Sequence, residues 1–140
     1  MDAQPQHPDS YQGLRDIITR LRAPDGCPWD QEQTHTTLRR NLLEECYEAL
    51  EALDVGDLES LSEELGDVLM QIVFHCQIAE ENGDFTDANM FHNINEKLVR
   101  RHPHVFADVV VKDAREVEVN WEETKKKERG DEVSVLDGVA

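Results

Sequence analysis

Residues 37–82 read TLRRNLLEECYEALEALDVGDLESLSEELGDVLMQIVFHCQIAEEN, and this stretch decides the fold. Its apolar residues recur at intervals of three and four, which is the spacing of an amphipathic α-helix. Gly56 interrupts the pattern as a helix stop, and Asp57 follows it as an N-cap. The stretch therefore predicts two helices, 37–55 and 58–82, that pair as an antiparallel hairpin.

The same helical spacing extends outward from this hairpin over most of the chain. The alternation of apolar and polar residues that is typical of strands is almost absent. Caps, glycines and prolines predict three further helices, at 11–22, 87–101 and 114–130, and a loop at 23–30. We therefore expect an all-α fold, an antiparallel helical bundle around a central acidic hairpin.

The length of 140 residues suits one compact domain. Residues 1–10 contain two prolines and no helical period, so we expect a disordered N-terminal tail. The domain is predicted over 11–130. Residues 131–140 have no clear period either, and we expect a C-terminal tail or a linker into a second domain.

The charge balance limits the partners of this protein. It carries 31 Asp and Glu against 14 Lys and Arg, a net charge of -17, which repels nucleic acid polymers and anionic membranes. No apolar run approaches the roughly 20 residues that span a bilayer, and the first residues lack a basic and then apolar signal. Three widely spaced cysteines do not form a disulfide framework. We therefore expect a cytoplasmic protein that binds neither nucleic acid polymers nor membranes.

Acidic side chains border the predicted seam between the hairpin helices. The apolar stripes expected to form the core are Leu38, Leu42, Cys46, Ala49, Leu50 and Leu53 on the first helix and Leu58, Leu61, Leu65, Val68, Leu69 and Ile72 on the second. At about 100° per residue, Glu45 falls at the edge of the first stripe and Glu48 lies one turn on, while Glu44 points toward solvent. The second helix repeats this arrangement with Glu64 and Asp67. Four carboxylates are therefore expected to meet at the seam.

Crowded carboxylates in a partly dry seam repel one another unless a cation neutralises them. Oxygen ligands without histidine or thiolate suit Mg²⁺, for which Mn²⁺ can substitute. A di-iron carboxylate bundle would need histidine three residues after Glu45 and Glu64, and neither has one. Gly66 is expected to let the neighbouring helix approach closely. The sequence therefore predicts a magnesium site.

Four blocks of sequence carry a family resemblance: Gly26-Cys27-Pro28-Trp29-Asp30 with Gln33-Thr34-His35, Glu44-Glu45-x-x-Glu48, Glu63-Glu64-Leu65-Gly66-Asp67, and KLVRRHPHVF at 97–106. In this order they closely resemble the MazG-type nucleoside triphosphate pyrophosphohydrolases, and the resemblance covers about residues 14–130. It implies an all-α, Mg²⁺-dependent enzyme. Such an enzyme splits a nucleoside triphosphate between its α and β phosphorus atoms into a monophosphate and pyrophosphate.

The resemblance also implies roles for individual residues. The family's metal ligands match the four carboxylates at the seam, Glu45, Glu48, Glu64 and Asp67. Its nucleotide contacts match two cations one turn apart and two residues of the last helix: Lys97, Arg101, Trp121 and Lys125. Ordinary core packing is the alternative for Trp121. Arg100 points about 100° away from Arg101, so it is expected to lie outside the phosphate contacts.

The attacking water needs a group that orients or deprotonates it. Glu44 and Glu48 are the candidates, because they are the glutamates least committed to the metal. The rival hypothesis from another functional class is a non-catalytic acidic helical module that binds a basic partner. Release of pyrophosphate from nucleoside triphosphates with Mg²⁺ separates the two hypotheses.

The second hairpin helix is apolar on more than one side. Beyond its main stripe it carries Met70, Val73 and Phe74, unlike a helix that faces water. A second helical surface should cover these residues, either the helix at 87–101 of the same subunit or a second subunit, and the family resemblance favours a homodimer. His75 is expected to be a hydrogen-bonded core residue rather than a ligand.

Overall fold

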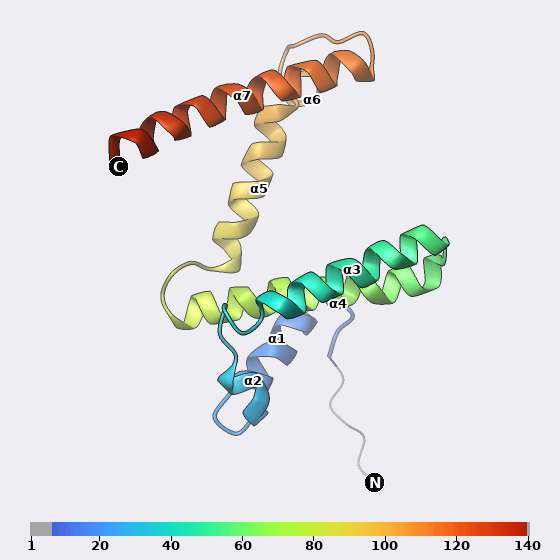
Figure 1. Ribbon diagram of the computed structural model, residues 1–140, viewed down its shortest axis with the longest axis vertical. Helices are drawn as coiled ribbons and strands as arrows, with labels where there is room; N and C mark the ends of the chain where they lie inside the picture. Colours follow the sequence, from blue (N-terminus) through green and yellow to red (C-terminus); the bar gives the residue numbers. More distant parts are fainter. Residues whose placement is uncertain (1–6, 140) are drawn as a thin grey trace. The chain divides into compact units, whose positions relative to one another are not determined.

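The computed structural model describes the backbone of residues 7–139 and the side chains of residues 7–130. Within these residues the protein has seven α-helices and no strand, so the predicted all-α class is confirmed (Figure 1). Most of the predicted N-terminal tail, residues 1–6, lies outside the described part. The chain divides into two compact units, Met1–Asp87 and Ala88–Ala140. None of the described helices is both long and apolar enough to span a bilayer.

The first unit contains α1 (Tyr11–Arg22), α2 (Pro28–Glu32), α3 (Arg39–Val55) and α4 (Leu58–Glu81). Ser10 caps α1 with its hydroxyl group, as the sequence predicts. The helix then ends before the proline that follows it, because the residue before a proline avoids helical backbone angles.

The short helix α2 lies where a loop was predicted at 23–30. Pro28 stands at its first position, where a missing N–H group costs nothing because no partner exists there. The side chain of Arg22 donates a hydrogen bond to the carbonyl oxygen of Asp30 at 2.6 Å. The prolines of this stretch predict a loop, and Pro28 begins a helix instead.

Helices α3 and α4 form the predicted antiparallel hairpin (Figure 1). Gly56 ends α3 in the left-handed conformation, with a φ of 78°, which glycine adopts without strain. Asp57 then caps α4 by accepting a hydrogen bond from the N–H of Ser60 at 3.2 Å. Gly83, with a φ of 74°, follows the end of α4. The turn chemistry of the sequence thus predicts both ends of the hairpin helices.

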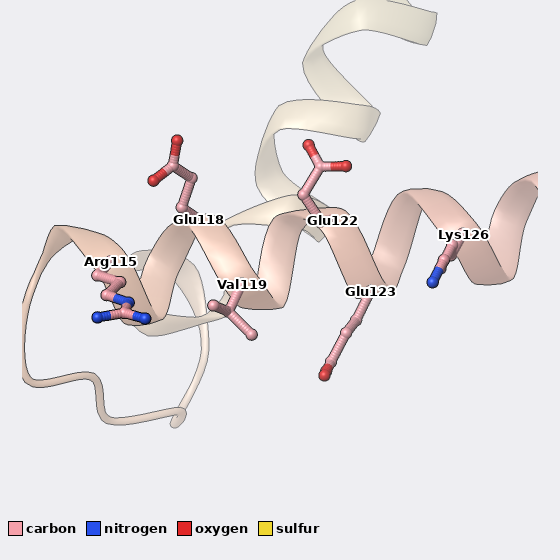
Figure 2. Close-up of a pocket in the computed structure, with 6 residues that line it drawn as sticks. All are labelled: Arg115, Glu118, Val119, Glu122, Glu123 and Lys126. Atoms are coloured by element: carbon pink, nitrogen blue, oxygen red, sulfur yellow. The ribbon is translucent and has the colours of Figure 1, made fainter.

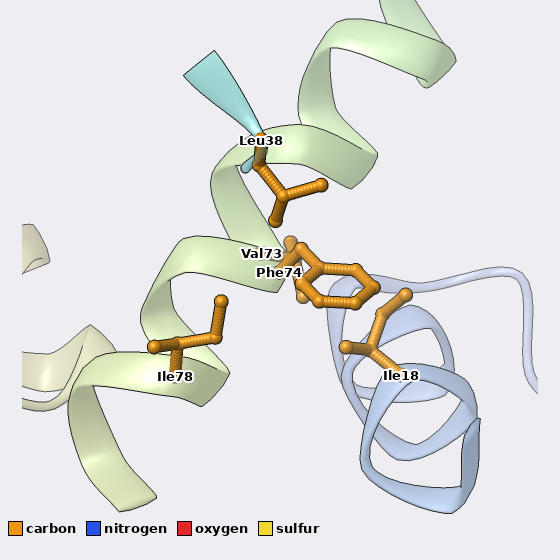
Figure 3. Packing of buried hydrophobic residues seen from close by; sticks show 5 residues of the cluster. All are labelled: Ile18, Leu38, Val73, Phe74 and Ile78. Carbon is orange, nitrogen blue, oxygen red and sulfur yellow. The ribbon is translucent and has the colours of Figure 1, made fainter. Parts of the chain in front are cut away.

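The core of the first unit lies between α1 and the later half of α4. Its buried members are Ile18, Leu38, Val73, Phe74 and Ile78. Figure 3 shows the ring of Phe74 pointing toward Ile18 from the opposite helix. Burying a side chain of this size contributes about 1.5–3 kcal/mol, so this cluster holds α1 on the hairpin.

The apolar stripe predicted as the core of α4 is not the face that this chain buries. Leu65 is 53% exposed and Leu69 is 41% exposed, whereas Val73 is fully buried. Helix α1 covers the second apolar side of α4, because α1 has only one amphipathic face and docks it there. The prediction of which side forms the core was therefore wrong for this helix. The side with Val73 and Phe74 was expected to be covered by the helix at 87–101 or by a second subunit, and α1 covers it instead.

In α3, too, part of the predicted apolar stripe is exposed. The predicted stripe includes Leu50 and Leu53, which are 52% and 54% exposed. The residues buried against α4 are small, Ala49 and Ala52, and they let the two helix backbones approach closely. The apolar side of α3 is therefore divided in two. Its small side chains lie in the seam with α4, and its large side chains form a face that nothing in the described part of this chain covers.

The second unit contains most of α5 (Asp87–Arg101), together with α6 (Pro103–Phe106) and α7 (Ala114–Val139). The one-turn helix α6 was not predicted, and again a proline occupies its first position. The backbone of α7 runs past Gly130, so the predicted end of this helix was wrong. One glycine costs a helix only about 1 kcal/mol, which is too little to end it when the flanking residues favour it.

Candidate metal centre and nucleotide contacts

Four carboxylates converge on the hairpin of α3 and α4: Glu45, Glu48, Glu64 and Asp67. Each offers one oxygen atom, and these four atoms all lie within 4.8 Å of one another. The pairs are three residues apart on each helix, so each pair shares one face. They also lie at similar distances from the turn at Gly56, which sets them opposite one another. The structure thus brings together all four predicted metal ligands.

Burial and mutual repulsion raise the pKa of two of these carboxyls. For Glu45 the main cause is desolvation, followed by the negative charges of Glu48 and Asp67. The pKa of Glu64 is raised by desolvation first, and then by its hydrogen bond with Glu48 and the surrounding charges. In both groups the environment disfavours the charged form unless a cation is present.

The donor atoms of this cluster fit a hard divalent cation. One oxygen each of Glu45 and Glu64 is buried and has no hydrogen-bond partner among the described residues. No ion pair in the described part of the chain involves any of the four acids. Unpaired buried carboxylate oxygens are costly, and oxygen atoms are the ligands that Mg²⁺ prefers.

The structure places Glu44 outside this cluster. Its side chain is 59% exposed and accepts a hydrogen bond from the Nε of Arg40 at 3.2 Å. Of the two residues predicted to act on the attacking water, only Glu48 therefore lies among the four clustered carboxylates.

The expectation that Gly66 brings a neighbouring helix close was wrong. A Cβ atom placed on Gly66 would meet no atom within 4 Å. At about 100° per residue, Gly66 lies about 200° around α4 from Glu64 and so faces away from the seam. Within this chain the space beside Gly66 is open, on the side of α4 that faces away from the seam.

A polar line continues from Asp67 along α4 through Gln71, which the sequence did not identify, to His75, which it predicts as a hydrogen-bonded residue. Gln71 is four residues on, is only 3% exposed, and has a buried side-chain oxygen without a partner among the described residues. His75 follows after another four residues, and its Nδ1 lies 2.7 Å from the Nδ1 of His35. Burial, and then the neighbouring His35, lowers the pKa of His75. The spacing of four from a predicted ligand was the signal that could have identified Gln71.

The four predicted nucleotide contacts lie on α5 and α7: Lys97, Arg101, Trp121 and Lys125. The guanidinium carbon of Arg101 lies 5.5 Å from the centroid of the Trp121 ring, which is within the range of a cation–π contact. The ring of His102 contacts the same indole edge-on, at 4.8 Å between centroids. Trp121 is half-buried, so it is neither a pure core residue nor a free one.

Arg101 also has a partner that the sequence analysis did not identify. It forms an ion pair with Glu128 of α7, and its side chain is only 17% exposed. Arg100 binds the same carboxylate, with its Nε 2.8 Å from an oxygen of Glu128. One carboxylate therefore reaches both side chains, although they point about 100° apart around α5. That Arg100 lies outside the phosphate contacts stays a prediction.

A shallow depression of about 500 Å³ runs along one face of α7 (Figure 2). Its lining residues follow one another at intervals of three and four on this single helix: Arg115, Glu118, Val119, Glu122, Glu123 and Lys126. None of the predicted site residues lines it.

Comparison with known proteins identifies relatives of the chain. Residues 33–106 match the MazG nucleotide pyrophosphohydrolase domain. The chain is 48% identical over 120 residues to the nucleoside triphosphate pyrophosphohydrolase/pyrophosphatase MazG of Thermotoga maritima, covering 86% of the chain and 46% of that protein. It is 46% identical over 129 residues to the nucleoside triphosphate pyrophosphohydrolase of Escherichia coli, covering 90% and 49%.

The solved structures agree with these matches. The crystal structure of a mazG-related protein from Thermotoga maritima superposes with a TM-score of 0.68 and 30% identity, covering 82% of this chain and 98% of that one. The chain spans about half the length of the two curated relatives named above. By its sequence match and its fold, the chain belongs to the MazG nucleotide pyrophosphohydrolase domain family.

Proposed function

We propose that the protein is a nucleoside triphosphate pyrophosphohydrolase, which hydrolyses ribo- or deoxyribonucleoside triphosphates to the monophosphate and pyrophosphate. The convergence of four carboxylates within 4.8 Å carries this proposal. Family membership supports it, because two relatives are named for this activity. Residues 11–130 are proposed as the catalytic domain, 131–140 as a tail or linker, and the cytoplasm as its location.

The proposed metal ligands are Glu45, Glu48, Glu64 and Asp67, and the proposed ion is Mg²⁺, with Mn²⁺ as a substitute. The buried, unpartnered oxygens of Glu45 and Glu64 support the assignment. When bound, the ion supplies the positive charge that stabilises the phosphate oxygens and the departing pyrophosphate. The four carboxylates would hold the ion between α3 and α4.

Glu48 is our first candidate for the residue that orients or deprotonates the attacking water. It belongs to the cluster and is exposed, so its carboxylate can reach both ligand neighbours and solvent. Glu44 is the second candidate, although its side chain binds Arg40. The water oxygen bonds to the α phosphorus in line while the bond to the bridging oxygen breaks. No covalent bond to the protein forms.

The proposed nucleotide contacts are Lys97, Arg101, Trp121 and Lys125. Three of them supply positive charge for the phosphates in a chain whose net charge is -17. Trp121 offers an aromatic face for the base. The contact between Arg101 and Trp121 supports a joint role for these two residues.

We also propose that two copies of the chain pair through the uncovered face of the hairpin. Leu50 and Leu53 of α3 and Leu65 and Leu69 of α4 are all at least two-fifths exposed. Exposed large apolar side chains gathered on one element mark an interaction surface. The helical positions of Glu48 and Asp67 turn these acids toward the opposite side of the hairpin.

Incubation with a panel of nucleoside triphosphates and Mg²⁺ tests the activity. We expect stoichiometric release of monophosphate and pyrophosphate, which ion-exchange chromatography separates from diphosphate and phosphate. A folded protein that releases no pyrophosphate from any of these substrates would contradict the proposal. That result would favour the acidic binding module.

A further inference from the structure

Glu128 links the two helices that carry the proposed nucleotide contacts. One of its oxygens forms an ion pair with Arg101, and the other lies 2.8 Å from the Nε and 2.6 Å from an Nη of Arg100. Its side chain is only 26% exposed, so solvent screens these pairs less than it screens most surface ion pairs. Within the second unit, α5 runs across the direction of α7 rather than alongside it (Figure 1). A few side chains therefore hold the two helices together.

On α7, Glu128 shares a face with the two proposed contacts of that helix. It lies three residues after Lys125 and seven after Trp121, which are intervals of one and two helical turns. The residue that holds the arginines of α5 is thus built into the face of α7 that presents Trp121 and Lys125.

The ion pair with Glu128 engages only one Nη of Arg101, and the Nε is buried without a hydrogen-bond partner among the described residues. A guanidinium group has five N–H donors in a fixed fork. Glu128 accepts from one Nη, and the guanidinium lies over the ring of Trp121 at 5.5 Å. The carboxylate therefore orients Arg101 without occupying it, and an oriented fork suits bidentate binding of a phosphate group.

We propose that Glu128 is a positioning residue of the nucleotide site, which holds Arg101 against Trp121 in the orientation that meets a phosphate group. The proposal rests on the proposed function, because it needs Arg101 to contact the nucleotide. Glu128 itself does not touch the nucleotide and acts through Arg101. Its hydrogen bonds with Arg101 and Arg100 lower its pKa, so it stays ionised at neutral pH.

A double-mutant cycle tests this. The binding of α,β-methylene-ATP with Mg²⁺, an analogue that cannot be split between the α and β phosphorus atoms, is measured by calorimetry for Glu128→Gln, Arg101→Ala and the double variant. We expect Glu128→Gln to weaken binding about tenfold, as for residues that are strongly coupled. In the Arg101→Ala background the same change should matter less than about twofold, because its effect passes through Arg101.

Steady-state kinetics supplies a second readout. Glu128→Gln should raise KM by a similar factor with little change in kcat, because the metal ligands are untouched. Glu123→Gln is the matched control, since it makes the same change on an exposed position of α7 and should leave both constants unchanged. If Glu128→Gln fails to fold by circular dichroism, Glu128→Asp replaces it. Asp keeps the negative charge but places it one methylene group further from the arginines. We then expect analogue binding to weaken a few-fold, and we expect no such weakening in the Arg101→Ala background.

Three results would overturn the proposal. Equal losses with and without Arg101 would mean that Glu128 acts through general stability. Unchanged or tighter binding would mean that Glu128 plays no positioning part or competes with phosphate for Arg101. If the parent protein releases pyrophosphate and binds the analogue, but the Glu128 variants give either of these results, the proposed function stands and only this inference fails. A folded parent that neither binds nor hydrolyses nucleotides would overturn both.

Discussion

Glu48 and Asp67 are the two exposed members of the carboxylate cluster, so their replacement should disturb the fold least. Glu48→Gln and Asp67→Asn each remove one ligand charge and keep the side-chain size. We expect pyrophosphate release to fall by more than about a hundredfold, because residues that only support metal ligands already cost about 10–100-fold. Calorimetric Mg²⁺ binding should weaken while circular dichroism stays unchanged. Turnover at the parent rate in both variants would remove the four-carboxylate site.

The raised pKa of Glu64 makes a separate prediction about stability without metal. The folded state binds the proton of Glu64 more tightly than the unfolded state, so the free energy of unfolding falls as the pH rises above about 4.3. Glu64→Gln removes this charge. In EDTA at pH 7 its melting temperature should exceed that of the parent by a few degrees, and the difference should shrink toward pH 4.

Glu51→Gln on the exposed side of α3 is the control for that measurement, since its carboxylate lies outside the cluster. It should melt with the parent at both pH values. An equal gain in the Glu51 variant would mean that the overall net charge, and not the cluster, lowers the stability of the metal-free protein.

At the scale of helices, the proposed phosphate contact Arg101 lies on α5, whereas the proposed metal ligands lie on α3 and α4. Arg101→Ala should weaken nucleotide binding or turnover about ten- to a hundredfold, which corresponds to a charge-assisted hydrogen bond worth about 1.5–3 kcal/mol. Binding of Mg²⁺ without nucleotide should be unchanged, because the proposed metal ligands lie on α3 and α4.

The structure changes the control for this experiment. Arg100 shares Glu128 with Arg101, so Arg100→Ala disturbs the same ion-pair group. Lys127→Ala is the better control, because it removes one positive charge from an exposed position of α7. Equal losses for Lys127→Ala and Arg101→Ala would mean that net charge, rather than a phosphate contact, governs binding.

The helix ends show which features of the fold neighbouring residues can predict. The caps at Ser10 and Asp57 and the glycine at position 56 act within a few residues, so the ends of α1, α3 and α4 could be predicted from sequence. The prolines at 28 and 103 were ambiguous. Proline both ends one helix and begins the next, and only the chain around it selects between these roles.

At the scale of the whole molecule, the uncovered face of the hairpin predicts a dimer. The parent should elute in light scattering at twice the chain mass of 16.1 kDa. Leu65 is 53% exposed in the single chain, so Leu65→Lys should cost little stability in a monomer, at most about 0.5 kcal/mol. In a dimer it buries an unpaired charge and should shift the mass toward that of one chain.

Val110→Lys introduces the same charge at a side chain that is 86% exposed and lies outside the hairpin. It should leave the mass at that of the parent. A parent that is monomeric at micromolar concentration, or a Leu65→Lys variant of unchanged mass, would remove this face from the proposed interface.

The sequence by itself determined the all-α class, the hairpin and the meeting of Glu45, Glu48, Glu64 and Asp67. These follow from a period of about 3.6 residues and a two-residue turn, which act along the chain. Their role as metal ligands remains a prediction.

Only the tertiary structure decided which apolar side of α4 lies against α1, and that Arg101 is held by a carboxylate 27 residues away. The sequence of α4 offers two apolar sides, and an arginine in an acidic chain has many potential partners. The choice depends on which surfaces meet in space. Which surfaces pack together depends on the shape and docking of whole helices, and this cannot be predicted from a local pattern of residues.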